Sequence, residues 1–168
     1  IEINKMKSPI GKQDHVPAVY GGINHILFQK NEKIIITKLS LSKKELNKLF
    51  TNSCLIWTNN SRSANTILKD QSEKINVNNS YLLEMKYLTR KSFNILKQNK
   101  NKNKNKINEF LDLILHSWSL KKKLTFKIMN KKIRKIENLI KKNNKFLSFK
   151  LLGAGGGGFY LVFFKDKI

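Results

Sequence analysis

The clearest pattern in the chain is a run of apolar positions at helical spacing. One face of a predicted helix carries Ile107, Phe110, Leu111, Ile114, Leu115 and Trp118. Weaker patterns of the same period predict helices over residues 42–49, 64–75, 80–98 and 130–143. A further short helix is expected near Asp14 and Pro17, because Asp is a good N-cap and Pro fits the first turn of a helix.

Strand-forming runs lie at both ends of the chain. Residues 24–29 and 33–39 are separated by a short polar turn, which favours a hairpin. Residues 53–58 form a third strand candidate, and 146–152 and 159–164 form two more. Strands and helices alternate without a strict strand–helix–strand period, so the predicted class is α+β. The Asn/Lys tract 99–106 is low in complexity and is predicted to be a solvated loop.

The segment Gly153–Gly158 lies between the last two predicted strands and holds five of the eight glycines. A dinucleotide-binding loop needs a helix after its glycines, and a Walker loop needs Lys and then Ser or Thr. Here Phe159 and Tyr160 follow and continue as a strand, which excludes both motifs. The segment is therefore predicted to be a tight loop that approaches a ligand or another loop, with a glycine-rich hairpin that binds nothing as the alternative.

The net charge of +23 raises the possibility of a nucleic-acid partner. Three features argue against it: arginine occurs only three times, the excess of Lys, Asn and Ile indicates an AT-rich gene, and the aromatic residues lie in apolar runs. With Cys54 as the single cysteine, no internal disulfide is possible, and a cytoplasmic location is expected. No apolar run of membrane-spanning length occurs, so no membrane partner is expected. Because the first residue is Ile1, we expect the chain to begin inside a longer protein.

Three segments together carry a family resemblance. They are Ser8-Pro-Ile-Gly-Lys-Gln-Asp14, Ser61-Arg-Ser63 and Leu151-Leu-Gly-Ala-Gly-Gly-Gly-Gly158. In this order and spacing the chain resembles the GHMP small-molecule kinases, and within them the D-glycero-D-manno-heptose 7-phosphate kinase branch. The turn Gly21–Asn24 and the segment His116–Lys121 add to the likeness.

The resemblance implies that residues 1–49 are the end of the GHMP kinase N-terminal domain. It implies that residues 50–168 are a ferredoxin-like C-terminal α/β sandwich domain. The main nucleotide loop of the family is absent and is expected upstream of Ile1. The chain alone is therefore expected to be inactive.

The implied function is ATP-dependent phosphorylation of a sugar or sugar phosphate, with Mg²⁺ as the metal cofactor. Asp14 is the implied catalytic residue, and its alternative role is a helix cap. The implied substrate-binding residues are Lys12, Gln13, Ser61, Arg62 and Ser63. The implied phosphate-adjacent loop comprises Gly153, Ala154, Gly155, Gly156, Gly157 and Gly158. No metal site is predicted from the residues themselves.

Two other functions stay open from the residues alone. The chain could be a basic module that binds RNA or another polyanion, which would show strongly salt-dependent binding. It could also be a degenerate domain that binds a ligand without catalysis.

Overall fold

The computed structural model describes residues 13, 15–60, 64–98 and 105–165. The described chain begins with α1 (His15–Tyr20), β1 (Ile23–Phe28) and β2 (Ile34–Leu39), followed by α2 (Lys43–Phe50), β3 (Ser53–Trp57) and α3 (Ala64–Glu73). It continues with α4 (Asn79–Lys97), α5 (Lys106–Leu124), the short 3₁₀ helix η1 (Phe126–Ile128) and α6 (Lys131–Lys142). The strands β4 (Phe146–Leu151) and β5 (Phe159–Phe164) complete it. The predicted α+β class is confirmed.

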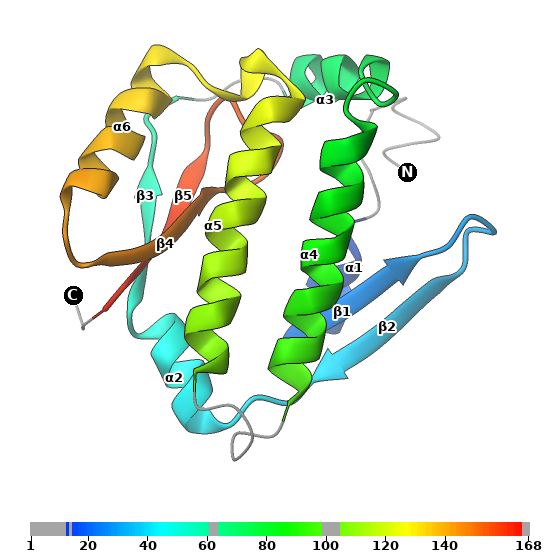
Figure 1. Cartoon of the computed structure of the whole chain (residues 1–168), viewed down its shortest axis with the longest axis vertical. Coiled ribbons are helices and arrows are strands. Elements are labelled where there is room, and N and C mark those ends of the chain that lie inside the picture. Colours follow the sequence, from blue (N-terminus) through cyan, green and yellow to red (C-terminus); the bar gives the residue numbers. More distant parts are fainter. Residues whose placement is uncertain (1–12, 14, 61–63, 99–104, 166–168) are drawn as a thin grey trace.

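Two separate antiparallel sheets organise these elements (Figure 1). β1 and β2 form the predicted hairpin, with Ile23 opposite Leu39 and Phe28 opposite Ile34. The second sheet has the strand order β3-β5-β4, so the central strand is the last one in the sequence. The glycine loop joins two antiparallel neighbours of this sheet, β4 and β5, as the sequence predicted.

The two long helices α4 and α5 lie side by side and are joined by the segment 98–105 (Figure 1). α5 packs on β4, and α6 flanks the same sheet. The hairpin approaches α4, where the ring of His25 stacks on Phe93 with 4.3 Å between the ring centroids. This arrangement places the glycine loop at the end of the sheet where α5 finishes.

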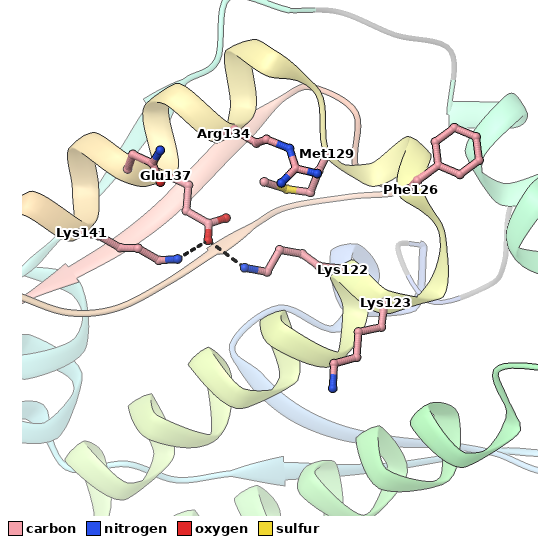
Figure 2. A pocket seen from close by; sticks show the side chains of 8 residues that line it. Lys122, Lys123, Phe126, Met129, Arg134, Glu137 and Lys141 are labelled. Carbon is pink, nitrogen blue, oxygen red and sulfur yellow. Dashed lines mark hydrogen bonds and ion pairs between the residues drawn. The ribbon is translucent and has the colours of Figure 1, made fainter.

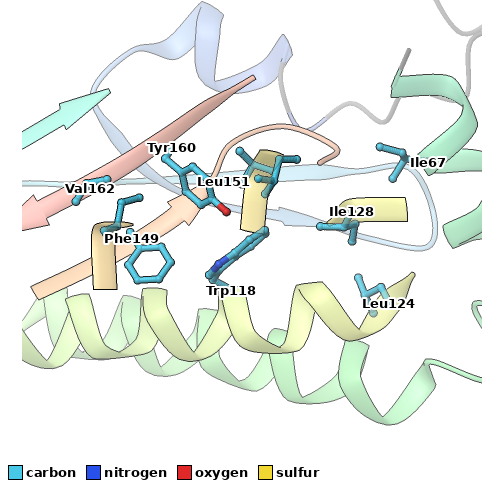
Figure 3. Packing of buried hydrophobic residues seen from close by; sticks show 10 residues of the cluster. Ile67, Trp118, Leu124, Ile128, Phe149, Leu151, Tyr160 and Val162 are labelled. Carbon is cyan, nitrogen blue, oxygen red and sulfur yellow. The ribbon is translucent and has the colours of Figure 1, made fainter. Parts of the chain in front are cut away.

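Both faces of the central strand are buried. Neighbouring strand residues point to opposite faces, and Val162 and Phe163 accordingly belong to different apolar clusters. The larger cluster gathers Trp118, Phe149, Leu151 and Tyr160 with residues of α3 and α6, as Figure 3 shows. Trp118 is 1% exposed, which confirms its predicted place on the core face of α5.

The predicted solvated loop over 99–106 was wrong at its end. Lys106 is the first residue of α5 and is 4% exposed. Its ammonium lies 2.9 Å from Glu45 Oε1 and donates to the carbonyl oxygens of Leu96 and Gln98. The composition of the tract predicted a solvated lysine. The Glu45 carboxylate and the backbone carbonyls at the C-terminal end of α4 instead give the buried ammonium its partners. Residues 99–104 lie outside the described residues.

Candidate functional site

The first half of the glycine loop borders a cleft of about 580 Å³. We call this the glycine-loop cleft and define it by the residues that line it: Gln13, Leu68, Gln71, Leu82, Met85, Ser117, Trp118, Lys121, Leu124, Lys150, Leu152, Gly153 and Ala154. These residues come from both ends of the chain and from α3, α4, α5 and β4. A cleft of this volume is within the usual range for small-molecule sites.

The second half of the loop is held by the protein itself. Asn60 accepts a hydrogen bond from Gly158 N–H at 3.1 Å and donates its side-chain amide to the Gly156 carbonyl. Gly156 N–H donates to the carbonyl of Ile128 at 2.9 Å, and Asn130 donates to the Gly156 carbonyl at 3.1 Å. These contacts fix the loop between the end of β3 and η1.

Glycine is required in this half of the loop for a steric reason. A Cβ on Gly157 would lie 2.2 Å from the backbone oxygen of Asn60, and one on Gly155 would lie 3.0 Å from side-chain atoms of Ile128. Gly153, Gly155, Gly156 and Gly158 also have positive φ angles. Close packing therefore accounts for Gly155 and Gly157, and a positive φ angle accounts for Gly156 and Gly158. Gly153 and Ala154 line the cleft.

The structure brings together only part of the predicted site. Gln13 lines the cleft together with Gly153 and Ala154, so residues from near both ends of the chain contribute to one cleft. The predicted site residues Lys12, Asp14, Ser61, Arg62 and Ser63 lie outside the described residues. Two described residues flank the Ser-Arg-Ser segment. Asn60 lies three residues after the end of β3 and bonds to the glycine loop, and Ala64 is the first residue of α3.

Sequence reasoning did not select four polar residues of the cleft: Gln71, Ser117, Lys121 and Lys150. Lys121 reaches the glycine loop and donates to the Gly153 carbonyl oxygen. Burial lowers the pKa of the Lys150 ammonium, since a charged group loses hydration there. The sequence pointed to two of these residues, Ser117 and Lys121, only through the segment His116–Lys121, which adds to the family likeness. In that segment Lys121 lies one helical turn beyond Trp118.

A second hollow of about 420 Å³ lies between the end of α5 and α6 (Figure 2). Its central group is Glu137, which is 3% exposed. Lys122 and Lys141 each bind the Glu137 carboxylate at 2.7 Å, and Trp118 Nε1 donates to it at 3.2 Å. Burial alone would raise the pKa of Glu137, but the hydrogen bonds from Lys122 and Lys141 outweigh it and lower the pKa.

The polar groups around Glu137 pair with one another inside the fold, so no ligand is needed to explain them. Tyr160 also contacts this carboxylate, at 3.4 Å, and its pKa is raised far above the ordinary value by burial and by the Glu137 charge. Because the two lysines are already paired with Glu137, they offer little free charge to a ligand. The glycine-loop cleft is therefore the stronger candidate for a functional site.

Among the residues that the structure describes, no group of three or more His, Cys, Asp or Glu side chains is placed to hold a metal. No helix in the described ranges has the length and apolar character to cross a membrane. Cys54 is a partly buried free thiol, and burial raises its pKa, so it is poorly suited to act as a nucleophile.

Comparison with known proteins agrees with the fold and with the predicted resemblance. Residues 95–168 match the family model described as GHMP kinases C terminal. This segment holds α5, α6, β4, the glycine loop and β5. The predicted resemblance to the GHMP kinases is confirmed.

The chain is 27% identical over 161 residues to the D-glycero-alpha-D-manno-heptose 7-phosphate kinase of Campylobacter jejuni. That alignment covers 93% of this chain and 44% of the relative, so the chain spans less than half of the length of that kinase.

Two solved structures share the fold. A D-glycero-D-manno-heptose 1-phosphate kinase from Bacteroides thetaiotaomicron superposes with a TM-score of 0.54 at 19% identity, over 98% of this chain and 41% of that one. The L. major mevalonate kinase in complex with R-mevalonate gives a TM-score of 0.62 at 14% identity, over 91% and 43%. At these identities the likeness establishes the fold alone.

Proposed function

We propose that this chain is the C-terminal part of an ATP-dependent kinase that phosphorylates a sugar or a sugar phosphate. The observation that carries the proposal is the glycine-loop cleft, which Gln13 lines together with Gly153 and Ala154. Gln13 belongs to the segment that supplies the predicted catalytic residue, and the loop is the predicted phosphate-adjacent element. The heptose 7-phosphate kinase of C. jejuni makes a heptose phosphate the first substrate to test.

In this proposal residues 1–49 complete an N-terminal domain and residues 50–168 form the C-terminal domain. Asp14 accepts the proton of the acceptor hydroxyl or orients that hydroxyl. Lys12, Gln13 and the Ser61-Arg62-Ser63 segment bind the acceptor. A guanidinium such as that of Arg62 suits a phosphate because it donates two parallel hydrogen bonds.

Phosphoryl transfer depends mainly on positioning and on the neutralisation of charge. The polar groups of the cleft supply both. Gln13, Gln71 and Ser117 offer hydrogen bonds, and Lys121 and Lys150 offer positive charge. The resemblance to the GHMP kinases implies ATP and Mg²⁺ as the cofactors. The described residues offer no carboxylate cluster that could hold the metal.

The decisive experiment measures ATP-dependent phosphorylation of D-glycero-D-manno-heptose 7-phosphate by the full-length protein that contains these residues. Asp14→Asn is expected to lower kcat by about 10²- to 10⁴-fold with little change in KM. Asp112→Asn is the matched control, because Asp112 is an exposed aspartate on α5 outside the cleft. Equal activity of both variants would assign Asp14 to capping.

The chain of residues 1–168 alone is expected to show no phosphoryl transfer above a contaminant control. Measurable transfer by this chain would contradict the proposed dependence on a nucleotide loop upstream. Strong salt-dependent binding to nonspecific RNA, without any response to sugar phosphates, would favour the polyanion-binding alternative.

A further inference from the structure

Lys150 has an unusual position for a lysine. It lies inside β4, between Phe149 and Leu151, which are both fully buried in the larger apolar cluster. Its own side chain points to the other face of the strand. There it lines the glycine-loop cleft together with Leu152. The side chain is partly buried, so its ammonium is held at the wall of the cleft rather than in bulk water.

The charge of Lys150 has no partner among the described residues. Other inward-facing lysines in this chain are paired: Lys106 with Glu45 at 2.9 Å and Lys122 with Glu137 at 2.7 Å. No hydrogen bond or ion pair joins the Lys150 ammonium to a described residue. Placing a charged group out of water without a partner costs free energy, and the lowered pKa of Lys150 has the same cause.

The surroundings of Lys150 favour an anion. No Asp or Glu lines the cleft among the described residues, whereas Lys121 does. Gln71 also lines the cleft, and its side-chain amide nitrogen is buried without a hydrogen-bond partner among the described residues. A buried donor that is left unpaired is rare in folded proteins and costs free energy. An unpaired cation and an unpaired donor at one cleft both call for an acceptor-rich ligand.

We propose that Lys150 binds the phosphate group already present on the acceptor, and so selects a phosphorylated sugar over the neutral one. This deepens the proposed function and rests on it. A phosphate monoester presents several acceptor oxygens and about two negative charges near neutral pH. It can therefore compensate the charge of Lys150, and its remaining oxygens can accept hydrogen bonds from polar groups of the cleft such as Gln71. A neutral sugar would leave the ammonium unpaired.

Binding is measured by calorimetry on the chain of residues 1–168, with D-glycero-α-D-manno-heptose 7-phosphate and the unphosphorylated heptose as probes. The phosphorylated sugar is expected to bind more tightly. Lys150→Met should weaken its binding by about 10- to 100-fold, as expected for a charge-assisted hydrogen bond, and should leave the neutral sugar unaffected. Lys150→Arg should retain part of the affinity, because it keeps the charge.

Lys145→Met is the matched control. Lys145 is an exposed lysine directly before β4 and does not line the cleft, but its substitution changes the net charge equally. Its affinity for the phosphorylated sugar should stay within about twofold of the wild type, since screened surface charges contribute little. Equal losses in both variants would indicate a general field effect and overturn the proposal.

Thermal unfolding separates binding from a structural role. Lys150→Met should unfold at the same or a higher temperature, because methionine can occupy the half-buried position without the cost of a desolvated charge. Lower stability together with unchanged affinity would overturn the proposal. The absence of phosphate-dependent binding to the wild-type chain would also overturn it.

The proposed role of Lys150 and the proposed kinase function can be refuted separately. If Lys150→Met loses the sugar phosphate but the full-length protein transfers no phosphoryl group, the anion site stands and the kinase proposal falls. If transfer occurs but Lys150→Met binds the sugar phosphate normally, the kinase proposal stands and Lys150 is not its phosphate ligand.

Discussion

Gly157→Ala tests whether the glycine loop is held by close packing. Gly157 has no positive φ, so alanine is conformationally allowed there. Its Cβ would nevertheless lie 2.2 Å from the carbonyl oxygen and 3.0 Å from the carbonyl carbon of Asn60. Both atoms belong to the backbone, so no side-chain rotation can relieve the contact. The loop has to move away from Asn60.

The cost follows from what that movement breaks. The hydrogen bond from Gly158 N–H to the Asn60 carbonyl, at 3.1 Å, is lost, and so is the one from the Asn60 side chain to Gly156. Each contributes about 1 kcal/mol, and overpacking adds about 1–3 kcal/mol. We therefore expect Gly157→Ala to lower the free energy of unfolding by about 3–5 kcal/mol.

Gly153→Ala provides the control. Gly153 has φ +67, but nothing lies within 4 Å of a Cβ built there. Only the left-handed backbone opposes the substitution, at about 1–2 kcal/mol. Urea unfolding followed by circular dichroism measures both, with the midpoint and slope reported together. If Gly157→Ala costs no more than Gly153→Ala, packing against Asn60 does not explain the loop.

The other predictions concern the buried ion pairs of Glu137 and Glu45 and the predicted phosphate-binding residue Arg62. Glu137→Gln leaves Lys122 without its carboxylate partner and should lower the free energy of unfolding by about 2–4 kcal/mol, measured by urea unfolding. Lys141→Met should cost under about 1 kcal/mol, since the Lys141 side chain is 50% exposed, and equal costs would refute the buried-pair account. Burial would raise the pKa of Glu45, but hydrogen bonds from Lys106 and Ser42 lower it to about 2 from 4.5. The stability that this carboxylate contributes is therefore present above about pH 4.5 and lost as the pH falls toward 2, because the unfolded chain takes up the proton first. Thermal midpoints measured over this range should fall less steeply in Glu45→Gln, and parallel curves would count against the assignment. In the full-length protein, Arg62→Lys should weaken sugar-phosphate binding by about 1–3 kcal/mol with ATP binding unchanged. Loss of ATP binding instead would move Arg62 to the nucleotide side.

Local pattern determined most of the secondary structure. The apolar period over 107–118 predicted the core of α5, which extends from Lys106 to Leu124. The strand runs on either side of Gly153–Gly158 predicted the β4–β5 hairpin, because strands that flank a short glycine loop pair with each other. The three-residue helix η1 was missed, since one turn is too short to show a period.

Only the tertiary structure decided which distant residues meet. Nothing local to Lys106 indicates Glu45, and nothing local to Gly157 indicates Asn60. The sequence singled out Gln13 and the glycine loop by family resemblance, but their shared cleft depends on how α3, α4, α5 and β4 pack. In the sequence, no local pattern distinguishes Lys150 from the other lysines in predicted strands. Its unpaired, half-buried charge follows from the elements packed around it, because desolvation depends on neighbours in space and not on neighbours in sequence.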